Sequence, residues 1–360
     1  MTRPSAARSG PALSGPAQSG PAQSGAAQPG PAQSGAPQSG AEQRELLAGL
    51  LPALRAYAIP LRNRFRGITV REGALLPGPA GWGEFSPFAE YGPAESARWL
   101  ASAIESATIG WPDPVRDTVG VNVTVPAVDP ELAHRIVAGS GCRTAKVKVA
   151  EPGQSEADDI GRVEAVRDAL GPAGRIRVDA NGGWEIDQAA RMLRRLCAFG
   201  LEYAEQPCAT LAELASLRRL VDVPLAADES IRKASDPLAV RAAGAADIVV
   251  LKVAPLGGVR AALAVAAGCG LPVVVSSAVE SSVGLAAGVA LAAALPDLAY
   301  DCGLATMNLL TGDVTDDPLM PTAGMLPLRA VTVDMKRLAH WECDPEPWRR
   351  RALAAAEFLA

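Results

Sequence analysis

The chain has 360 residues, of which 49% are hydrophobic and 20% are charged, and its formal net charge is −5. This apolar content is enough for a sizeable core in one or two domains, and it excludes a wholly disordered chain. The net negative charge argues against a nucleic-acid-binding protein with a broad basic surface. Only two histidines occur, so a site built from several imidazole groups is not expected.

Cysteine usage and hydropathy bear on the compartment of the protein. The six cysteines include no Cys-x-x-Cys pair, which predicts reduced thiols in a cytoplasmic protein rather than a disulfide framework. The most apolar run, residues 283–295, is shorter than the roughly 20 residues that a bilayer requires. No apolar block follows Arg3 and Arg8, so we expect neither a signal peptide nor a membrane partner.

The N-terminal 43 residues consist largely of a repeat. From Ser9 to Gln43 a five-residue unit recurs in forms such as SGPAQ and SGAEQ. Such a segment has few side chains to bury and many helix-breaking residues, so residues 1–43 are predicted to form a disordered tail. A dispensable tail is favoured over a functional tether.

Residues 44–116 predict a separate α+β unit. A helical pattern covers residues 42–58, and a second one covers residues 94–107. Two strand-like segments lie between them, at residues 65–76 and 81–87. Helices and strands that follow one another without regular alternation are typical of a small α+β domain.

The pattern becomes regular between residues 117 and 330, where eight short β-rich runs alternate with helical stretches. The runs are VGVNVTV (119–125), TAKVKV (144–149), RIRVDA (175–180), LEYAEQ (201–206), PLAADE (224–229), DIVVLKV (247–253), PVVVSS (272–277) and LAYDCG (298–303). Alternating βα units of this number, without a Rossmann fingerprint, predict a closed α/β barrel. The last segment, residues 331–360, either returns to the N-terminal unit or covers the bottom of the barrel.

Charged residues close five successive β-rich runs. They are Lys148, Asp179, Glu205, Asp228 and Lys252, spaced by 31, 26, 23 and 24 residues. Each stands at the carboxyl end of its strand, where barrel enzymes place their active sites. Because side chains alternate along a strand, these five should share the inner face, whereas Ile176 and Val178 should face the helices.

The chemistry of this inner set favours a metal-assisted proton transfer. Three carboxylates in one cavity repel one another unless a cation lies between them. Oxygen-only ligands favour Mg²⁺, with Mn²⁺ as a substitute, over Zn²⁺. Two flanking lysines can act as acid and base, so the pattern indicates abstraction of a proton next to a carboxylate.

The alternative interpretation is that these residues have only a structural role, as helix caps or surface groups. Asp228, which precedes Glu229 and Ser230, could be such a cap. Five residues of complementary type at the ends of consecutive units are much harder to explain in this way. We therefore favour the catalytic interpretation.

Short motifs around these residues resemble a known family. KVK (146–148), DANGGW (179–184), EYAEQP (202–207), ADES (227–230) and VLKVAPLGGV (250–259) resemble the muconate-lactonizing subgroup of the enolase superfamily. Within that subgroup, RNRFRGITVREG (62–73) and GWGEFSPFAEY (81–91) look most like the actinobacterial o-succinylbenzoate synthases. The resemblance implies a (β/α)7β barrel, TIM-like, with an N-terminal α+β capping domain.

The resemblance also implies an activity in menaquinone biosynthesis, the Mg²⁺-dependent dehydration of 2-succinyl-6-hydroxy-2,4-cyclohexadiene-1-carboxylate to 2-succinylbenzoate. Asp179, Glu205 and Asp228 would bind the metal. Lys148 would remove the proton alpha to the ring carboxylate and then protonate the departing hydroxyl. Lys252 would stabilise the enediolate from the other side of the substrate. The implied partner is a small-molecule carboxylate.

Further residues are candidates for the surroundings of the site. Lys146 shares the face of Lys148 and could lower its pKa, although a salt bridge to a carboxylate is an alternative. Arg177 could orient an inward carboxylate or form a buried ion pair. Asn181 could hydrogen-bond a metal-bound carboxylate or cap the next helix.

Two other segments could contact the substrate. Ser276, Ser277 and Gly303 stand near the ends of the last two strands, and their backbone N–H groups could hold the succinyl carboxylate. In the predicted cap, Arg64, Phe65 and Arg66 could reach the substrate, but a surface strand is equally consistent with this segment.

Two other functions remain open at this point. N-succinylamino acid racemases and dipeptide epimerases also carry a lysine on each side of the site, so the inner set does not separate them from the synthase. A non-catalytic barrel that only binds a ligand would be expected to lack some member of the inner set, and all five are present. The sequence does not predict the oligomeric state.

Overall fold

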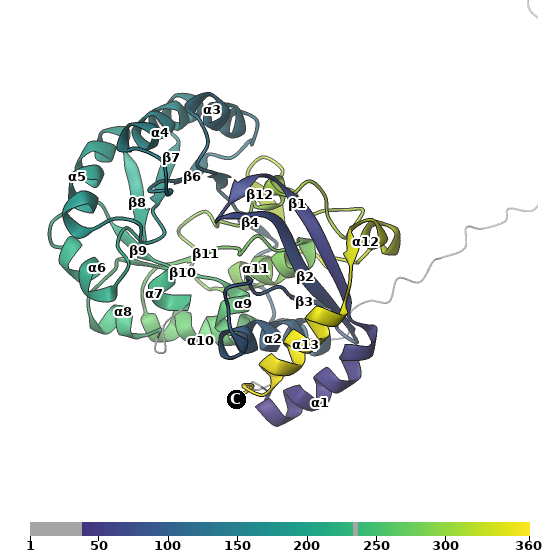
Figure 1. Ribbon diagram of the computed structural model, residues 1–360. Helices are drawn as coiled ribbons and strands as arrows, with labels where there is room; N and C mark the ends of the chain where they lie inside the picture. The colour runs from purple at the N-terminus through teal and green to yellow at the C-terminus, as the bar shows by residue number, and fades with distance from the viewer. Residues whose placement is uncertain (1–37, 233–236) are drawn as a thin grey trace, which may run out of the picture. The chain divides into compact units, whose positions relative to one another are not determined.

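The structure is a computed structural model that describes residues 38–232 and 237–360. All of these residues belong to one compact unit. The prediction of a disordered tail, as far as it concerns residues 1–37, lies outside the described residues. Two main sheets organise the described part, one of four strands and one of seven (Figure 1).

The four-stranded sheet forms the centre of the N-terminal cap. Its order is β13-β1-β2-β3, and the strands span Glu342–Cys343 (β13), Arg55–Phe65 (β1), Ile68–Gly78 (β2) and Gly81–Phe85 (β3). β1 and β2 form an antiparallel hairpin that closes between Phe65 and Ile68. The two turn residues, Arg66 and Gly67, have φ values of 49° and 79°. Such left-handed pairs are typical of tight hairpin turns, because their twist matches that of the strands.

The first helix begins earlier than the sequence prediction allowed. α1 (Gly40–Leu50) starts at a capping box, in which the Ser39 hydroxyl accepts from the Glu42 N–H and the Glu42 carboxylate accepts from the Ser39 N–H. This reciprocal pair satisfies two backbone donors that a helix start leaves free. The prediction of disorder was therefore wrong for residues 40–43.

The same helix also ends earlier than predicted. Pro52, which has no N–H to donate, lies in the short 3-10 helix η1 (Leu51–Ala53) that follows α1. The chain then enters β1, in which Ala56, Tyr57 and Ile59 are fully buried. The helix predicted over residues 42–58 was therefore wrong for residues 55–58, because pairing with β2 and β13 outweighs the local helical pattern.

The second predicted helix and the C-terminal segment complete the cap. α2 (Pro93–Thr108) confirms the helix predicted over residues 94–107. The sequence left the place of residues 331–360 open. After α12 (Met335–Trp341), β13 pairs with β1 and α13 (Glu346–Ala356) packs on α2, so the C-terminus lies against the cap. In Figure 1 the yellow α13 runs beside α1 and α2.

The seven-stranded sheet is parallel and follows the chain order, β11-β10-β9-β8-β7-β6-β5. Its strands span Val123–Val125 (β5), Thr144–Lys148 (β6), Arg175–Asp179 (β7), Leu201–Glu205 (β8), Leu225–Ala227 (β9), Ile248–Leu251 (β10) and Val273–Val275 (β11). The eighth predicted run contributes two parallel bridges, Val121 with Cys302 and Ser276 with Gly303. The first bridge joins the eighth run to the first run, and the second joins it to the seventh run. The ring of strands is therefore closed, which confirms the (β/α)7β barrel.

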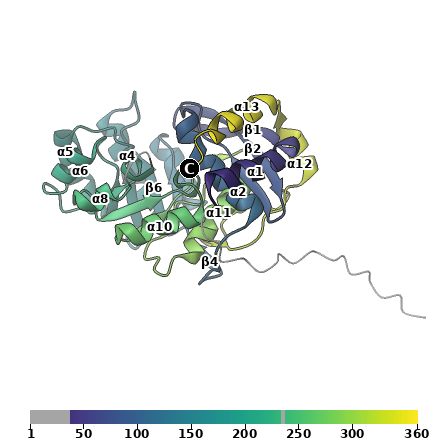
Figure 2. The ribbon, with the colours of Figure 1, turned by 90° about the horizontal axis from the view of Figure 1, so that it is seen from below.

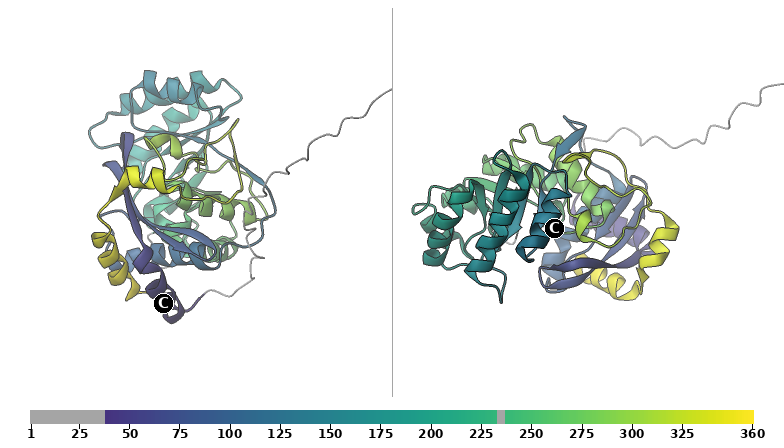
Figure 3. Two further views of the ribbon diagram at one scale, coloured as in Figure 1. Left: turned by 90° about the vertical axis from the view of Figure 1, so that its right-hand side faces the viewer. Right: turned by 90° about the horizontal axis from the view of Figure 1, so that it is seen from above.

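The helices of the barrel domain follow its strands. They span Pro130–Ala138 (α3), Glu156–Leu170 (α4), Ile186–Leu196 (α5), Leu211–Leu217 (α6), Glu229–Arg232 (α7), Ala239–Ala242 (α8), Val253–Leu256 (α9), Val259–Cys269 (α10) and Ser282–Ala294 (α11). Two 3-10 helices, Cys197–Phe199 (η2) and Met307–Leu309 (η3), and a small sheet of β4 (Thr118–Gly120) with β12 (Met325–Pro327) complete this part. In Figure 2, α4, α5 and α6 lie at one side and the cap elements at the other, and Figure 3 shows the same separation by colour.

The alternation of side chains along the strands follows the prediction. Ile176 and Val178 belong to the large core between the strands and the helices. A separate apolar cluster fills the barrel interior, and it includes Tyr203, Ala226 and Val250. Each of these three stands two residues before a charged member of the inner set. These side chains therefore form an apolar layer inside the barrel, next to the charged residues at the strand ends.

Two glutamates of the cap bind the start of two barrel helices. The Glu84 carboxylate, on β3, accepts from the Ser281 N–H at 3.1 Å and the Gly284 N–H at 3.0 Å, at the beginning of α11. The Glu105 carboxylate, on α2, accepts from the N–H groups of Val259 (2.5 Å) and Arg260 (3.2 Å), at the beginning of α10. A carboxylate is favoured there because the first N–H groups of a helix have no partner within it.

Within residues 38–232 and 237–360, no helix is both long enough and apolar enough to cross a bilayer.

Candidate active site

The inner set lies at the carboxyl ends of β6 to β10, around a pocket with about 390 Å³ of empty space. The residues that line it are Phe65, Arg66, Thr124, Lys146, Lys148, Asp179, Asn181, Asp228, Arg232, Lys252, Ser276, Ser277, Ala278, Val279, Gly303 and Thr306. Four of the five predicted residues are in this lining, and the fifth, Glu205, is buried and contacts Lys146. The fold therefore brings the whole predicted set together.

On one side of the pocket, two lysines pair with two carboxylates. Lys148 Nζ donates to Asp179 Oδ2 at 2.6 Å and to Asn181 Oδ1 at 2.6 Å. Lys146 Nζ donates to Glu205 Oε1 at 2.9 Å and lies 3.2 Å from Asp179 Oδ2. Lys146 thus forms the salt bridge that was the alternative interpretation of this residue, and Asn181 binds the predicted base directly.

On the opposite side, Asp228 is shared by two cations. Lys252 Nζ donates to Asp228 Oδ2, and Arg232 Nε donates to Asp228 Oδ1 at 3.1 Å. Arg232 also donates to Glu229 and, at 2.6 Å, to the hydroxyl of Tyr91 in the cap. Arg232 was not predicted from the sequence, although its spacing of four residues from Asp228 on a helical segment was a usable signal.

A further residue missed in the sequence is Gln206, directly after β8. Its Oε1 accepts from the N–H groups of Asp228 (3.0 Å) and Ser230 (3.1 Å), and its Nε2 donates to Ser230 Oγ at 2.8 Å. Gln206 is fully buried, so these bonds fix the backbone that carries Asp228. The motif EYAEQP contains this glutamine, but nothing local indicates its partners 22 and 24 residues away.

The electrostatics of the site reflect burial and charge pairing. Burial opposes ionisation of Asp179, but Lys148 and Lys146 outweigh it and hold the pKa of Asp179 well below its usual range. The pKa of Asp228 is likewise lowered against burial by Lys252 and Arg232. Burial, together with the charge of Asp179, raises the pKa of Glu205 to about 7. Burial lowers the pKa of Lys252, which is the direction that helps a lysine to exchange protons.

The three carboxylates fit a hard divalent cation by their chemistry. They are oxygen donors and are buried, and burial together with the charge of Asp179 raises the pKa of Glu205. Lysine ammonium groups contact all three carboxylates. Among the described residues, no three Asp, Glu, His or Cys side chains are close enough together to hold a metal ion as they stand. A metal would therefore have to displace ammonium contacts at this position.

Arg177 lies on the inner face of β7 but at the lower end of the barrel. Its guanidinium donates to Glu202 Oε2 at 2.6 Å, Asn122 Oδ1 at 3.0 Å and the Asp301 carbonyl at 2.6 Å. It is fully buried and is not among the residues that line the pocket. The structure therefore places it in the buried ion pair that was its alternative interpretation, outside the lining of the pocket.

Ser276, Ser277 and Gly303 line the pocket, but the predicted use of their backbone N–H groups was wrong. The Ser276 N–H donates to the Leu251 carbonyl at 2.9 Å, and the Ser277 N–H donates to the Gly303 carbonyl at 3.0 Å. The Gly303 N–H donates to the Val275 carbonyl at 2.8 Å. The Ser276 N–H binds β10, whereas the Ser277 and Gly303 N–H groups join the seventh run to the eighth, so pairing within the barrel takes up all three donors. The Ser277 hydroxyl is hydrogen-bonded to that of Thr306 at 2.6 Å.

The cap contributes to the same pocket. Phe65 and Arg66, from the turn between β1 and β2, line it, and the Phe65 ring centroid lies 5.3 Å from Lys148 Nζ. Arg64 is exposed on the same hairpin. Of the predicted cap segment, the structure therefore brings Phe65 and Arg66 to the pocket and leaves Arg64 on the surface.

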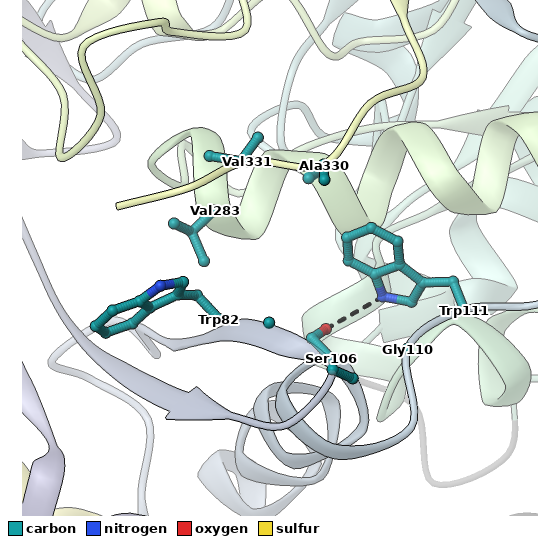
Figure 4. Close-up of a pocket in the computed structure, with 10 residues that line it drawn as sticks. Trp82, Ser106, Gly110, Trp111, Val283, Ala330 and Val331 are labelled. Atoms are coloured by element: carbon teal, nitrogen blue, oxygen red, sulfur yellow. Dashed lines mark hydrogen bonds between the residues drawn. The ribbon is translucent and has the colours of Figure 1, made fainter. Parts of the chain in front are cut away.

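A second pocket lies where the cap meets the barrel domain (Figure 4). It has about 400 Å³ of empty space and is lined by Trp82, Trp111 and Val283 among ten residues, none of which is ionisable. Trp111 Nε1 donates to Ser106 Oγ at 3.3 Å in its wall. Without acid, base or metal-binding groups, this pocket does not offer the chemistry of the first.

Comparison with protein families supports the division into cap and barrel. Residues 56–107 match the family described as enolase N-terminal domain-like, and residues 129–331 match the family described as enolase C-terminal domain-like. Among solved structures, muconate lactonizing enzyme from Pseudomonas fluorescens has a TM-score of 0.70 at 23% identity, covering 81% of this chain and 98% of that one. N-succinyl Arg/Lys racemase from Bacillus cereus has the same TM-score at 22% identity, covering 81% and 97%. These structures share the fold.

Curated relatives are much closer in sequence. The o-succinylbenzoate synthase of Thermobifida fusca is 71% identical over 301 residues, which cover 84% of this chain and 95% of the relative. The o-succinylbenzoate synthase of Mycobacterium ulcerans is 56% identical over 313 residues, with coverage of 86% and 90%. Together with the shared fold and the pocket, these identities show that the chain belongs to the o-succinylbenzoate synthases of the enolase superfamily.

Proposed function

We propose that the pocket catalyses the dehydration of 2-succinyl-6-hydroxy-2,4-cyclohexadiene-1-carboxylate to 2-succinylbenzoate, with Lys148 as the base. One observation carries the assignment of roles: two lysines and three carboxylates converge at the ends of five successive strands. Lys148 and Lys252 approach from β6 and from the end of β10, and bind different carboxylates. This arrangement supports a substrate held between a base and a second cation.

Lys148 would carry out both proton transfers. Its neutral amine takes the proton alpha to the ring carboxylate, and the electron pair of the broken C–H bond moves into that carboxylate as an enediolate. The C–O bond to the ring hydroxyl then breaks, and the oxygen leaves as water with the proton returned by Lys148. Asn181 Oδ1, 2.6 Å from Lys148 Nζ, would orient the amine during this exchange. The ring becomes aromatic, which makes the elimination downhill.

The remaining charged groups would stabilise the negative charge that develops. Asp179, Glu205 and Asp228 would hold a divalent cation, which we propose is Mg²⁺ with Mn²⁺ as a substitute, and whose chemistry is to stabilise charge on the substrate carboxylate. Lys252, buried beside Asp228, would present its ammonium group to the enediolate from the other side. Gln206 and Arg232 would keep Asp228 in place.

Removal of divalent ions tests this assignment. Turnover of the cyclohexadiene, followed by ultraviolet absorbance, should fall about 100-fold or more in excess EDTA, since the enediolate loses its main electrostatic stabilisation. Activity should return when Mg²⁺ is added beyond the EDTA. Full activity in EDTA, after the protein has been dialysed against the chelator, would contradict the metal assignment while leaving the lysine assignment open.

Replacing Lys252 by arginine separates the dehydration from racemisation on the same site. Arginine keeps the positive charge but does not exchange protons near neutral pH. We expect Lys252→Arg to retain dehydration within about 10- to 100-fold of the wild-type rate. Any racemisation of N-succinylamino acids should disappear, because that reaction needs a proton acceptor on each side. Racemisation that persists in this variant would refute the two-lysine account.

A further inference from the structure

Two side chains of α4 bind the backbone that carries Lys148. Arg162 Nη1 donates to the Lys148 carbonyl at 2.7 Å, and Asp159 Oδ2 accepts from the Ala150 N–H at 2.9 Å. The two side chains also bind each other, with Arg162 Nη1 donating to Asp159 Oδ1 at 2.9 Å. Asp159 and Arg162, called the α4 pair below, therefore contact the chain on both sides of the last residue of β6 and the two that follow it.

The α4 pair is buried and lies outside the pocket. The side chains of Arg162 and Asp159 are 1% and 4% exposed, and neither residue is in the pocket lining. Because burial removes water from both charges, such a pair adds little net stability compared with apolar side chains of similar size. Its distinct contribution here is a set of directed hydrogen bonds to the backbone.

The backbone that the α4 pair binds is strained at Ala150. The φ of Ala150 is 59°, a left-handed value that brings Cβ close to the following carbonyl oxygen. Asn181 and Gln206, just after β7 and β8, also have positive φ values, of 47° and 38°. Strain of this kind persists only where the surroundings hold it. The methyl side chain of Ala150 has no hydrogen bond to offer, so its conformation depends on contacts such as the bond to Asp159.

Arg162 extends the same support to the neighbouring strand. Its Nε donates to the Val128 carbonyl at 2.7 Å, and its Nη2 donates to Gln154 Oε1. Val128 follows β5, and Gln154 precedes α4. The planar guanidinium thus joins the loop after β5, the end of β6 and the start of α4 through one rigid group. Lys148 stands on the middle one of these three segments.

The proposed base depends on where its backbone stands. Lys148 Nζ reaches Asp179 and Asn181 at 2.6 Å each, at the end of a flexible four-carbon side chain. Proton transfer requires the reacting atoms to be in close contact, and a misplacement of about 1 Å can lower a rate about 100-fold. A small shift of residues 148–150 would therefore reach the reacting atom.

We propose that Asp159 and Arg162 are positioning residues for the base, which hold the backbone of residues 148–150 so that Lys148 Nζ stands beside the substrate carbon. This inference rests on the proposed function for the role of Lys148. Neither member of the α4 pair lines the pocket. Their loss should therefore slow proton transfer and leave the binding of substrate and product nearly unchanged.

The first test separates kcat from binding. Asp159→Ala should lower kcat for the cyclohexadiene about 10- to 100-fold, because the Ala150 N–H loses its acceptor. The KM, and the Kd for 2-succinylbenzoate by calorimetry, should change less than about threefold. Asp159→Asn keeps an oxygen that can accept from Ala150, so it should recover most of kcat. Arg162→Lys cannot make all the bonds of the guanidinium and should show the same split, and it carries the test if Asp159→Ala does not fold.

The matched controls are Asp158→Ala and Arg167→Lys on the same helix. Asp158 Oδ2 accepts from the Ser155 N–H at 2.8 Å, and Arg167 Nε donates to the Phe199 carbonyl at 2.9 Å. These two side chains therefore also bind backbone groups, but of segments other than residues 148–150. Both controls should lower the free energy of unfolding in urea and leave kcat within about twofold of wild type.

Hydrogen–deuterium exchange gives a readout that does not need turnover. The amide of Ala150 should exchange about 10-fold faster or more in Asp159→Ala, and at the wild-type rate in Asp158→Ala. A kcat for Asp159→Ala within about threefold of wild type, or an equal loss of kcat in Asp158→Ala, would overturn the positioning role. If the wild-type protein does not convert the cyclohexadiene, the proposed function is wrong, and exchange at Ala150 still decides whether the α4 pair holds this backbone.

Discussion

Replacing Lys148 by alanine should lower kcat for the dehydration by about 1,000-fold or more, because both proton transfers lose their carrier. Lys148 Nζ is held at 2.6 Å from both Asp179 and Asn181, at the carboxyl end of β6. Lys146 also lies 3.2 Å from Asp179, but it donates to Glu205, and Lys252 binds Asp228. Among the described lysines, Lys148 is the one that contacts both Asp179 and Asn181. The rate is measured by the ultraviolet change on aromatisation, with circular dichroism to show that the variant is folded.

A matched control is Lys336→Ala. Lys336 is exposed on α12, so its removal should leave the rate unchanged. Exchange of solvent deuterium into the substrate provides a second readout for Lys148→Ala, because loss of the base should stop exchange as well as elimination. If Lys148→Ala kept more than about a tenth of the wild-type kcat, a different group would have to be the base.

Replacing Glu84 by alanine should lower the free energy of unfolding by about 3 kcal/mol or more. Besides the two N–H groups at the start of α11, the Glu84 carboxylate accepts from Tyr57 Oη (2.6 Å), Ser86 Oγ (2.8 Å) and Ser281 Oγ (2.5 Å). Glu84 and these hydroxyl groups are buried. Its removal would leave several buried donors without an acceptor, which costs more than the mean value of a hydrogen bond.

Urea unfolding followed by circular dichroism measures this effect. Glu84→Gln keeps the size and one acceptor oxygen, so it should be destabilised less than Glu84→Ala. Glu72→Ala is the control for losing a glutamate from the cap sheet, since Glu72 is exposed on β2. It should change the free energy of unfolding by no more than about 0.5 kcal/mol. Equal stability of Glu84→Ala and Glu72→Ala would show that the cap does not depend on this carboxylate.

The residues of the catalytic face could be predicted from the sequence because the rules that place side chains on a strand are local. Side chains alternate strictly along a strand, and the parallel strands of a barrel end on the same side. The positions of Lys148, Asp179 and Asp228 at the carboxyl ends of β6, β7 and β9 therefore determined that they meet, and the structure places them around one pocket. The same alternation predicted that Val178 would face the helices, as it does.

Contacts between distant segments were decided only by the tertiary structure. Glu84 binds the start of α11 across 197 and 200 residues of sequence, and Arg232 reaches Tyr91 across 141. No periodicity in either segment encodes the other partner. The strand at residues 55–58 depends in the same way on β2 and β13, which override the local helical pattern.

The backbone N–H groups of Ser276, Ser277 and Gly303 were predicted wrongly for the same physical reason. The sequence placed these residues beside the pocket, and the structure keeps them there. Whether their N–H groups are free depends on how the barrel closes, and closure pairs residues 276 and 303 with each other. By itself, then, the sequence determined the barrel, the inner face and the chemistry of its charged groups. The tertiary structure decided which polar groups remain free for a ligand, because each donor can be assigned only when all its neighbours are known.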